Sequence, residues 1–256
     1  MKKIFSIVTF LLFISLITQG QNELYLKKQF VNKGDTLHYR VLFPDNYDKS
    51  KSYPLVLFLH GAGERGKDNE KQLIHGASLF SNITTRTNYP AIVLFPQCPA
   101  NGFWVKLGDK INGNHNFLIA SAPDKSLELV IKLVDFYKKN EAVDNKRLYV
   151  LGISMGGMGT FDLICRYPKT FAAAVPICGG VNLERLEKIR KMPVRIYHGG
   201  SDNVVLPENS RNAFNQLKLI GSKKVEYIEF PGVGHNSWTK AFEQKNFLSW
   251  MFSQKK

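Results

Sequence analysis

Short apolar runs recur along this chain of 256 residues, and segments with helical spacing separate them. Six of the runs are predicted to be strands: Pro54–His60, Ala91–Pro96, Arg147–Ile153, Phe171–Ile177, Val194–His198 and Val225–Phe230. The first four are almost continuously apolar, as in strands of a parallel sheet that is covered on both faces. This alternation limits the chain to a layered α/β fold.

Helical patterns fill several of the intervals between these runs. One follows Asp124 and Ser126, which are both good N-terminal caps, and the others span Met155–Tyr167, Asn209–Ile220 and Thr239–Phe252. A possible antiparallel hairpin comes first, and neither a repeat nor a linker interrupts the rest. We therefore predict one domain over residues 21–256, a mostly parallel, twisted sheet with helices on both faces.

The first twenty residues have the layout of a secretory signal peptide. Lys2 and Lys3 precede an apolar run over 4–17, and small residues lead to a cleavage site ahead of Gln21. The run is shorter than the roughly 20 residues that a spanning helix needs. No cysteine follows it to accept a lipid, so we predict a secreted or periplasmic protein without a membrane anchor.

The charge of the chain is strongly positive but dispersed. Lys and Arg number 35 against 21 Asp and Glu, a formal net charge of +14. The basic residues recur as pairs rather than as a block, and no nucleic-acid motif accompanies them. Solvated faces explain this pattern better than nucleic-acid binding. With only three cysteines, stability must come from an apolar core.

A candidate nucleophile lies where the strand Arg147–Ile153 meets the next helix. The sequence Gly152-Ile153-Ser154-Met155-Gly156 is a G-x-S-x-G motif in that context. A serine on a sharp strand-to-helix turn has a strained backbone, and small neighbours avoid clashes there. The alternative is a glycine-rich turn that only allows tight packing. The candidate base and acid, identified next, favour the interpretation of Ser154 as a nucleophile.

A serine nucleophile needs a histidine base and a carboxylate that orients it. In a fold that carries this turn the chain order is serine, acid, histidine. His235 follows the last predicted strand on a loop and is the candidate base, whereas His198 more plausibly shapes the loop of the acid. Asp202 is the candidate acid. Its alternatives lie within a strand (Glu226, Glu229) or in the first turn of a helix (Glu208).

Acyl transfer also requires two backbone N–H donors for the oxyanion. Met155, directly after the nucleophile, is predicted to supply one. The glycine-rich loop His60-Gly-Ala-Gly-Glu-Arg-Gly follows an apolar strand and should supply the other, from Ala62 or failing that Gly63. Glu64 and Arg65 either brace this loop or are exposed charges.

Together these motifs resemble the α/β-hydrolase superfamily. The resemblance rests on His60–Gly66, 95–99 (Phe-Pro-Gln-Cys-Pro), Gly152–Gly156, Asp202 and Gly234–Trp238. Within this superfamily, the chain more specifically resembles secreted esterases related to feruloyl and acetylxylan esterases, dienelactone hydrolases and polyhydroxyalkanoate depolymerases. Several relatives in this group are described as predicted peptidases. Dienelactone hydrolases carry a cysteine where this chain has Ser154, which argues against that activity.

Substrate selection is predicted to come from the long segment between Pro96 and Asp124. There Trp104 is either an aromatic wall for a phenolic acyl group or a buried anchor, and Gln97 is a second candidate substrate-binding residue. Trp238 has the same two interpretations, and packing is favoured because it begins a helix. Cys98 and Cys178 follow strands at the catalytic edge, where an exported protein could join them or leave them free.

The sequence therefore predicts an exported serine hydrolase of carboxylic esters that acts through an acyl-enzyme. The resemblance implies feruloyl or acetyl esters of plant cell-wall polysaccharide as substrates. A serine peptidase is the alternative within the same chemistry, and an inactive carbohydrate-binding or surface protein is the alternative outside it. His198 and Asp202 have metal-ligand spacing but lack a third ligand, so no metal or other cofactor is predicted.

Overall fold

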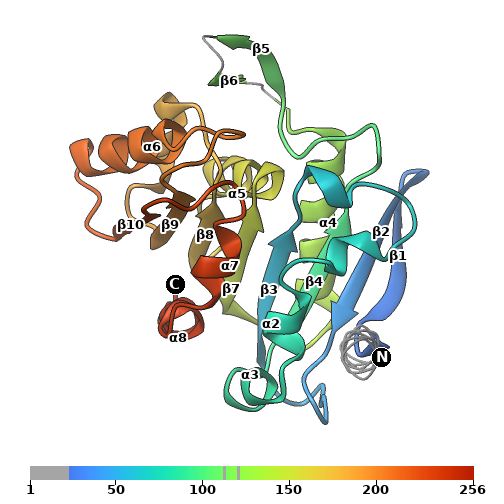
Figure 1. Cartoon of the computed structure of the whole chain (residues 1–256). Coiled ribbons are helices and arrows are strands. Elements are labelled where there is room, and N and C mark those ends of the chain that lie inside the picture. The colour runs from blue at the N-terminus through green and yellow to red at the C-terminus, as the bar shows by residue number, and fades with distance from the viewer. Residues whose placement is uncertain (1–22, 112–113, 120–121) are drawn as a thin grey trace, which may run out of the picture.

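The computed structural model describes residues 23–111, 114–119 and 122–256. Eight strands form the main sheet, in the order β1-β2-β4-β3-β7-β8-β9-β10 (Figure 1). Their bounds are β1 Leu26–Asn32, β2 Asp35–Leu42, β3 Tyr53–Leu59, β4 Ile92–Gln97, β7 Val143–Ile153, β8 Ala173–Ile177, β9 Val194–Gly199 and β10 Val225–Phe230. β1 and β2 are an antiparallel hairpin, and β2 pairs antiparallel with β4.

The remaining pairs of this sheet, from β4 to β10, are parallel. Successive residues of the central strands point to opposite faces. In β3, for example, Leu55 and Leu57 enter one core cluster, while Val56 and Phe58 enter the other. Because β3 is buried on both faces, its sequence is a continuous apolar run. This confirms the predicted mostly parallel sheet.

Helices cover both faces of the sheet. One face packs against α4 (Lys125–Asn140), α5 (Met155–Arg166), η3 (Leu183–Ile189, a 3₁₀ helix) and α6 (Glu208–Leu219). The other packs against α2 (Ala77–Ser81), α7 (Trp238–Phe242) and α8 (Phe247–Ser253), and the short α3 (Ile83–Asn88) follows α2. The 3₁₀ turns η1 (Ala62–Glu64) and η2 (Lys71–Leu73) lie between β3 and α2. Asp124 caps α4, as predicted, by accepting a hydrogen bond from the Ser126 backbone N–H.

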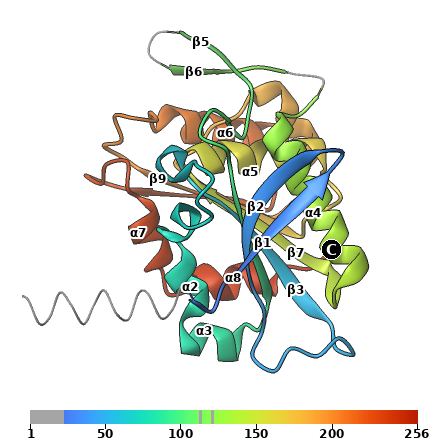
Figure 2. The ribbon, with the colours of Figure 1, turned by 90° about the vertical axis from the view of Figure 1, so that its right-hand side faces the viewer.

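Two segments differ from the sequence prediction. The segment between β4 and α4 contains a separate two-stranded sheet of β5 (Leu107–Ile111) and β6 (Asn114–Phe117), which projects from one end of the molecule (Figure 2). The helix expected over Thr239–Phe252 is instead α7 and α8, because the four residues 243–246 are all exposed and give the helix no apolar face to continue on.

The predicted signal peptide, residues 1–20, lies outside the described residues. Among the helices that the structure does describe, not one combines the length and the apolar character that crossing a bilayer demands.

Candidate active site

Ser154 occupies the turn between β7 and α5 with a backbone φ of 53°. This left-handed value is strained for any residue with a Cβ atom. The neighbouring glycines are required because backbone atoms of adjacent segments lie too close to leave room for a Cβ atom. A Cβ on Gly152 would lie 2.3 Å from the Gly156 carbonyl oxygen, and one on Gly156 would lie 1.9 Å from the Leu59 carbonyl oxygen. The turn is thus the predicted nucleophile turn in backbone conformation as well as in sequence.

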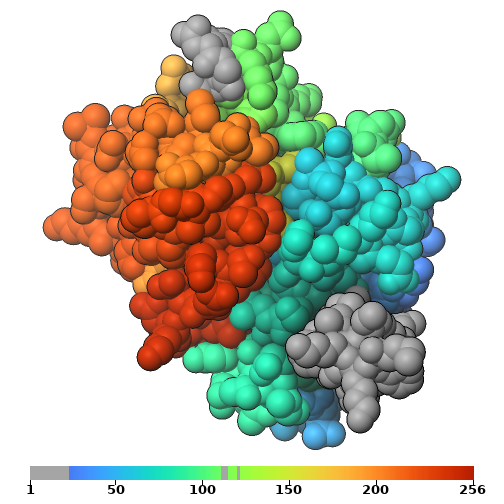
Figure 3. Space-filling model, viewed as in Figure 1, coloured from blue at the N-terminus to red at the C-terminus, as the bar shows by residue number. Residues whose placement is uncertain are grey.

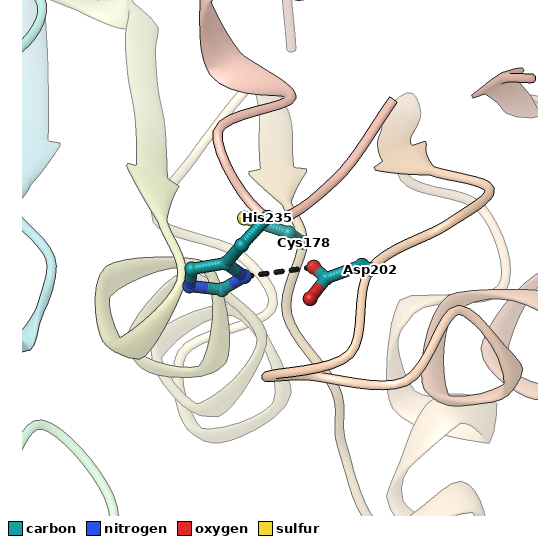
Figure 4. Close-up of side chains that lie close together, drawn as sticks. All are labelled: Cys178, Asp202 and His235. Atoms are coloured by element: carbon teal, nitrogen blue, oxygen red, sulfur yellow. Dashed lines mark hydrogen bonds and ion pairs between the residues drawn. The ribbon is translucent and has the colours of Figure 1, made fainter. Parts of the chain in front are cut away.

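The structure brings the three predicted catalytic residues into one chain of hydrogen bonds. His235 Nε2 lies 2.9 Å from Ser154 Oγ, and His235 Nδ1 lies 2.7 Å from Asp202 Oδ2 (Figure 4 shows the second contact). A carboxylate only accepts, so Nδ1 carries the proton and Nε2 presents a lone pair to the serine hydroxyl. This is the tautomer that a general base needs.

Asp202 is held by more than the base it orients. Its Oδ1 accepts from the backbone N–H groups of Val204 and Val205, at 2.9 and 3.0 Å. Its Oδ2 also lies 3.2 Å from His198 Nε2. The residue is therefore an Asx-turn residue and the partner of His235 at once.

The same contacts determine the charge of Asp202. Burial alone would raise the pKa of this carboxyl, but the hydrogen bonds from His198, His235 and the two backbone N–H groups lower it well below its ordinary value. Asp202 is consequently ionised at neutral pH, as the stabilisation of a protonated His235 requires. His198 is fully buried, with its imidazole between Ser210 Oγ and the Val205 carbonyl oxygen. It shapes the acid's loop, as expected.

The two predicted oxyanion donors lie on adjacent segments. Met155 is the first residue of α5, where backbone N–H groups have no partner within the helix and the helix dipole favours negative charge. Ala62 begins η1, separated from the end of β3 by two residues, and Leu59 of β3 pairs with Gly152 of β7. Both positions thus lie at the carboxyl edge of neighbouring parallel strands, where Ser154 also stands.

A buried histidine fixes the peptide unit that carries the Ala62 N–H. His60 Nδ1 lies 2.6 Å from the Gly61 carbonyl oxygen, and the Cys98 backbone N–H donates to His60 Nε2 at 2.9 Å. These partners require a neutral imidazole with its proton on Nδ1. In a planar trans peptide C=O and N–H point in opposite directions, so holding Gly61 O orients Ala62 N–H. Burial lowers the pKa of His60 to about 4, which keeps it neutral.

Arg65 fixes the next peptide unit of the same loop. Its guanidinium donates to the Ala62 carbonyl oxygen at 2.9 Å and to the Gly102 carbonyl oxygen at 3.2 Å. It therefore braces the loop, as one of the two interpretations proposed, but through backbone carbonyls rather than through Glu64. Glu64 instead faces His75, with Oε1 3.7 Å from Nε2.

Trp104 does not line a pocket, which corrects the first substrate-binding prediction. Its side chain is fully buried, and its indole Nε1 donates to the His60 carbonyl oxygen at 3.0 Å. The rings of Trp104 and His60 also meet edge to face, with centroids 5.2 Å apart. A buried indole needs a partner for its N–H, and here that partner is the oxyanion loop.

Gln97 is likewise a brace and not a substrate contact, which corrects the second prediction. It is 1% exposed. Its Oε1 accepts from Asn69 N, and its Nε2 donates to the Glu64 carbonyl oxygen and to Asp68 Oδ1. Both amide protons and the amide oxygen are therefore engaged inside the protein. The strand-end position of Gln97 suggested a site residue, but its polar atoms point into the loop.

Cys178 lies behind the catalytic pair, with its Sγ in the same 4.8 Å cluster as ligand atoms of Asp202 and His235 (Figure 4). Burial raises the pKa of this thiol to about 12, so it is protonated at neutral pH. A protonated thiol is a poor metal ligand, and Asp202 is already engaged by its hydrogen bonds. All three cysteines are free, so the Cys98–Cys178 pairing is absent from the structure.

Trp238, for which the sequence favours packing, and His75, which the sequence does not single out, both lie beside the catalytic base. Trp238 meets the His235 imidazole edge to face, with ring centroids 5.6 Å apart, and His75 packs on Trp238 at 5.1 Å. The spacing of Trp238 three residues after His235 was the available signal. His75 carries no motif, and only the fold brings it here.

The family model described as phospholipase/carboxylesterase matches residues 46–251. Among curated relatives, Carboxylesterase SOBER1 of Arabidopsis thaliana is 29% identical over 212 residues, which cover 77% of this chain and 88% of the relative. Probable feruloyl esterase C of Aspergillus oryzae is 26% identical over 209 residues, which cover 81% and 70%.

A solved structure is similar over nearly the whole described chain. The crystal structure of a thermostable esterase superposes with a TM-score of 0.84 at 36% sequence identity, and the match covers 92% of this chain. The chain spans 64% of the length of that esterase. The fold is accordingly that of the α/β-hydrolases, as the sequence motifs predicted.

Proposed function

We propose that this chain, which belongs to the phospholipase/carboxylesterase family, is an exported esterase that removes feruloyl or acetyl groups from plant cell-wall polysaccharide. The observation that carries the ester chemistry is the hydrogen-bond chain from Ser154 through His235 to Asp202. This chain of hydrogen bonds activates the Ser154 hydroxyl on a strained turn, beside two backbone N–H donors. Acyl transfer requires an activated nucleophile and such donors for the oxyanion.

In the acylation step Ser154 Oγ attacks the ester carbonyl carbon and its proton passes to His235 Nε2. The carbonyl oxygen becomes an oxyanion that the N–H groups of Met155 and Ala62 stabilise. His235 then gives the proton to the alkoxide oxygen of the alcohol, the carbon–oxygen bond breaks, and the acyl group stays on Ser154. Asp202 remains ionised and stabilises the imidazolium that forms in between.

Deacylation repeats the sequence with water in place of Ser154. His235 takes a proton from the attacking water, the same two N–H groups hold the second oxyanion, and His235 returns the proton to Ser154 Oγ. The carboxylic acid leaves and the free enzyme is restored. Acylation and deacylation thus use the same residues: Ser154, His235, Asp202 and the two N–H donors.

The acyl group is inferred from relatives and not from a pocket. The Aspergillus oryzae relative, of which the match covers 70%, is named probable feruloyl esterase C. Because Trp104 is buried, it gives no support for an aromatic acyl group, so acetyl and feruloyl esters stand as equal candidates. Export is supported by the basic, apolar and small-residue pattern of residues 1–20 alone.

A substrate panel on the mature protein tests this proposal. We expect faster hydrolysis of methyl ferulate or of acetylated xylo-oligosaccharide than of peptide amides, since an amine leaves only after protonation. Faster cleavage of peptide amides would identify a peptidase instead. Failure of a fluorophosphonate probe to label the protein would favour the inactive binding protein.

Export is tested separately in the native host. Fractionation should find the protein outside the cytoplasm with an N-terminus at Gln21. A cytoplasmic protein that retains Lys2 and Lys3 would contradict this part of the proposal.

A further inference from the structure

We propose that the groove between α2 and α7 is the subsite for the sugar ring that carries the ester oxygen, with the Trp238 indole as its stacking surface. The inference rests on the proposed function, because it assigns the alcohol half of the same substrate. The groove has a volume of about 570 Å³, within the range of small-molecule sites. In Figure 3 it lies where the surface of the C-terminal segment, drawn in red, meets that of residues near 75–85, drawn in teal to green.

The groove adjoins the catalytic base through Trp238. Trp238 forms part of its wall and contacts the His235 imidazole edge to face, with ring centroids 5.6 Å apart. Trp238 is only partly buried, so the ring is accessible from the groove. A ligand on this indole would therefore lie next to the residue that delivers the proton.

The chemistry decides which half of the ester lies there. His235 Nε2 must pass its proton to the departing alcohol oxygen, so the alcohol has to stand on the His235 side of the ester. The carbonyl oxygen must at the same time point toward Met155 and Ala62 at the adjoining strand ends. The groove that opens beside Trp238 is thus placed for the alcohol and not for the acyl group.

The lining fits a sugar ring better than an alkyl chain. Its apolar lining residues are Trp238, Phe242, Leu79 and the exposed Ile74. Hydroxyl and amide side chains interrupt this surface, among them Thr85 and Asn82. A pyranose or furanose has an apolar face that packs on an aromatic ring and a rim of hydroxyls that needs such polar partners. A long alkyl chain would desolvate those polar groups without pairing them.

The groove is also tied to the oxyanion loop. His75 packs on Trp238, with ring centroids 5.1 Å apart, and its Nε2 lies 3.7 Å from Glu64 Oε1 of η1. Glu64 is 8% exposed and lies in η1, which begins with Ala62. His75 therefore links the Trp238 wall of the groove to the loop that carries the Ala62 N–H donor.

The test compares two esters that share an acyl group and differ in the alcohol. For each variant, kcat/KM is measured on two pairs of esters. The feruloyl pair is a feruloylated arabino-oligosaccharide and methyl ferulate, and the acetyl pair is acetylated xylo-oligosaccharide and methyl acetate. The ratio of sugar ester to methyl ester cancels any displacement of His235, because that would slow both. Trp238→Ala should lower this ratio about tenfold, equivalent to about 1.4 kcal/mol, and Trp238→Phe should lower it less.

Trp250→Ala is the matched control, since Trp250 lies on α8, where it packs on Arg195 and donates to Glu226. Its ratio should equal that of the wild type. The subsite is wrong if wild-type enzyme cleaves sugar esters and Trp238→Ala leaves the ratio unchanged, or if Trp250→Ala lowers it equally. If wild-type enzyme cleaves methyl esters but neither sugar ester, the proposed polysaccharide substrate fails first and the sugar subsite with it.

Discussion

The two loops that meet at the reaction centre are held in different ways. The turn between β7 and α5 is fixed by its backbone: Ser154 has a strained φ of 53°, and the flanking glycines approach neighbouring carbonyls too closely for a Cβ atom. The loop after β3 is fixed by side chains that reach its carbonyl oxygens, from His60, Arg65 and Trp104. The turn is specified by its own short segment, whereas the loop also depends on Trp104, which lies 44 residues beyond His60 in the chain.

This difference explains which residues can be read from a sequence. A turn that depends on glycines leaves a short motif, and the motif identifies the nucleophile. A loop braced from a distance leaves polar and aromatic residues at positions far apart in the chain. Trp104 and Gln97 looked like substrate contacts because they follow a strand at the catalytic edge, yet both support the oxyanion loop.

The largest effect should come from the locally specified turn. Ser154→Ala removes the nucleophile, and we expect kcat on a small ester to fall by about 10⁶-fold. Stability should change little, because the hydroxyl points to the base and not into the core. Steady-state assays and thermal unfolding measure the two quantities. Near-normal activity would show that another group attacks.

Asp202→Asn should lower kcat by about 10⁴-fold. The amide keeps the shape of the turn but presents His235 with a donor where it needs an acceptor, which favours the wrong tautomer. A kcat–pH profile checks this assignment. If the Asn variant is nearly silent while Glu229→Gln is severe, the acid has been misassigned.

The side-chain braces should have smaller effects, confined to transition-state stabilisation. His60→Leu frees the Gly61 carbonyl and with it the Ala62 N–H, so we expect kcat to fall about 10²-fold at nearly constant KM. His60→Asn keeps a donor near the Nδ1 position and should recover part of the loss. His38→Ala, on the β1–β2 hairpin, is the control. A rise in KM with constant kcat would point to substrate binding instead.

His60 also makes stability depend on pH. Its pKa is about 4 in the folded protein and about 6.5 in an unfolded chain, so the unfolded state binds more protons between these values. The contribution is therefore fully present above pH 6.5 and is lost as the pH falls toward 4. It should amount to about 2 kcal/mol between pH 7 and pH 5. Urea unfolding should show a shallower pH dependence for His60→Leu than for wild type.

The smallest of these effects belongs to Trp104. Trp104→Phe keeps a ring but leaves the His60 carbonyl without its indole partner, and we expect kcat/KM to fall about tenfold. Because the ring is a brace, feruloyl and acetyl esters should lose equally. A loss confined to the feruloyl ester would restore Trp104 as a wall of the acyl site.

Much of the fold follows from the sequence because buried parallel strands are almost continuously apolar, as in Leu55–Leu59. The hairpin β5–β6 does not, since its residues form a small separate sheet and lack a continuous apolar run. Ser154, Asp202 and His235 could be found because chain order and strand ends restrict them. His75 could not, because its contacts with Trp238 and Glu64 arise only when α2 packs beside α7.

The central claim, that Ser154 forms a covalent acyl intermediate which His235 and Asp202 turn over, has a direct test. The protein is mixed with an activated ester, quenched within milliseconds and digested, and the modified peptide is sequenced by mass spectrometry. We predict an acyl adduct on Ser154 of the wild-type protein and no adduct at this position in Ser154→Ala. An adduct on Cys178 or another side chain, or hydrolysis without any adduct, would contradict the account.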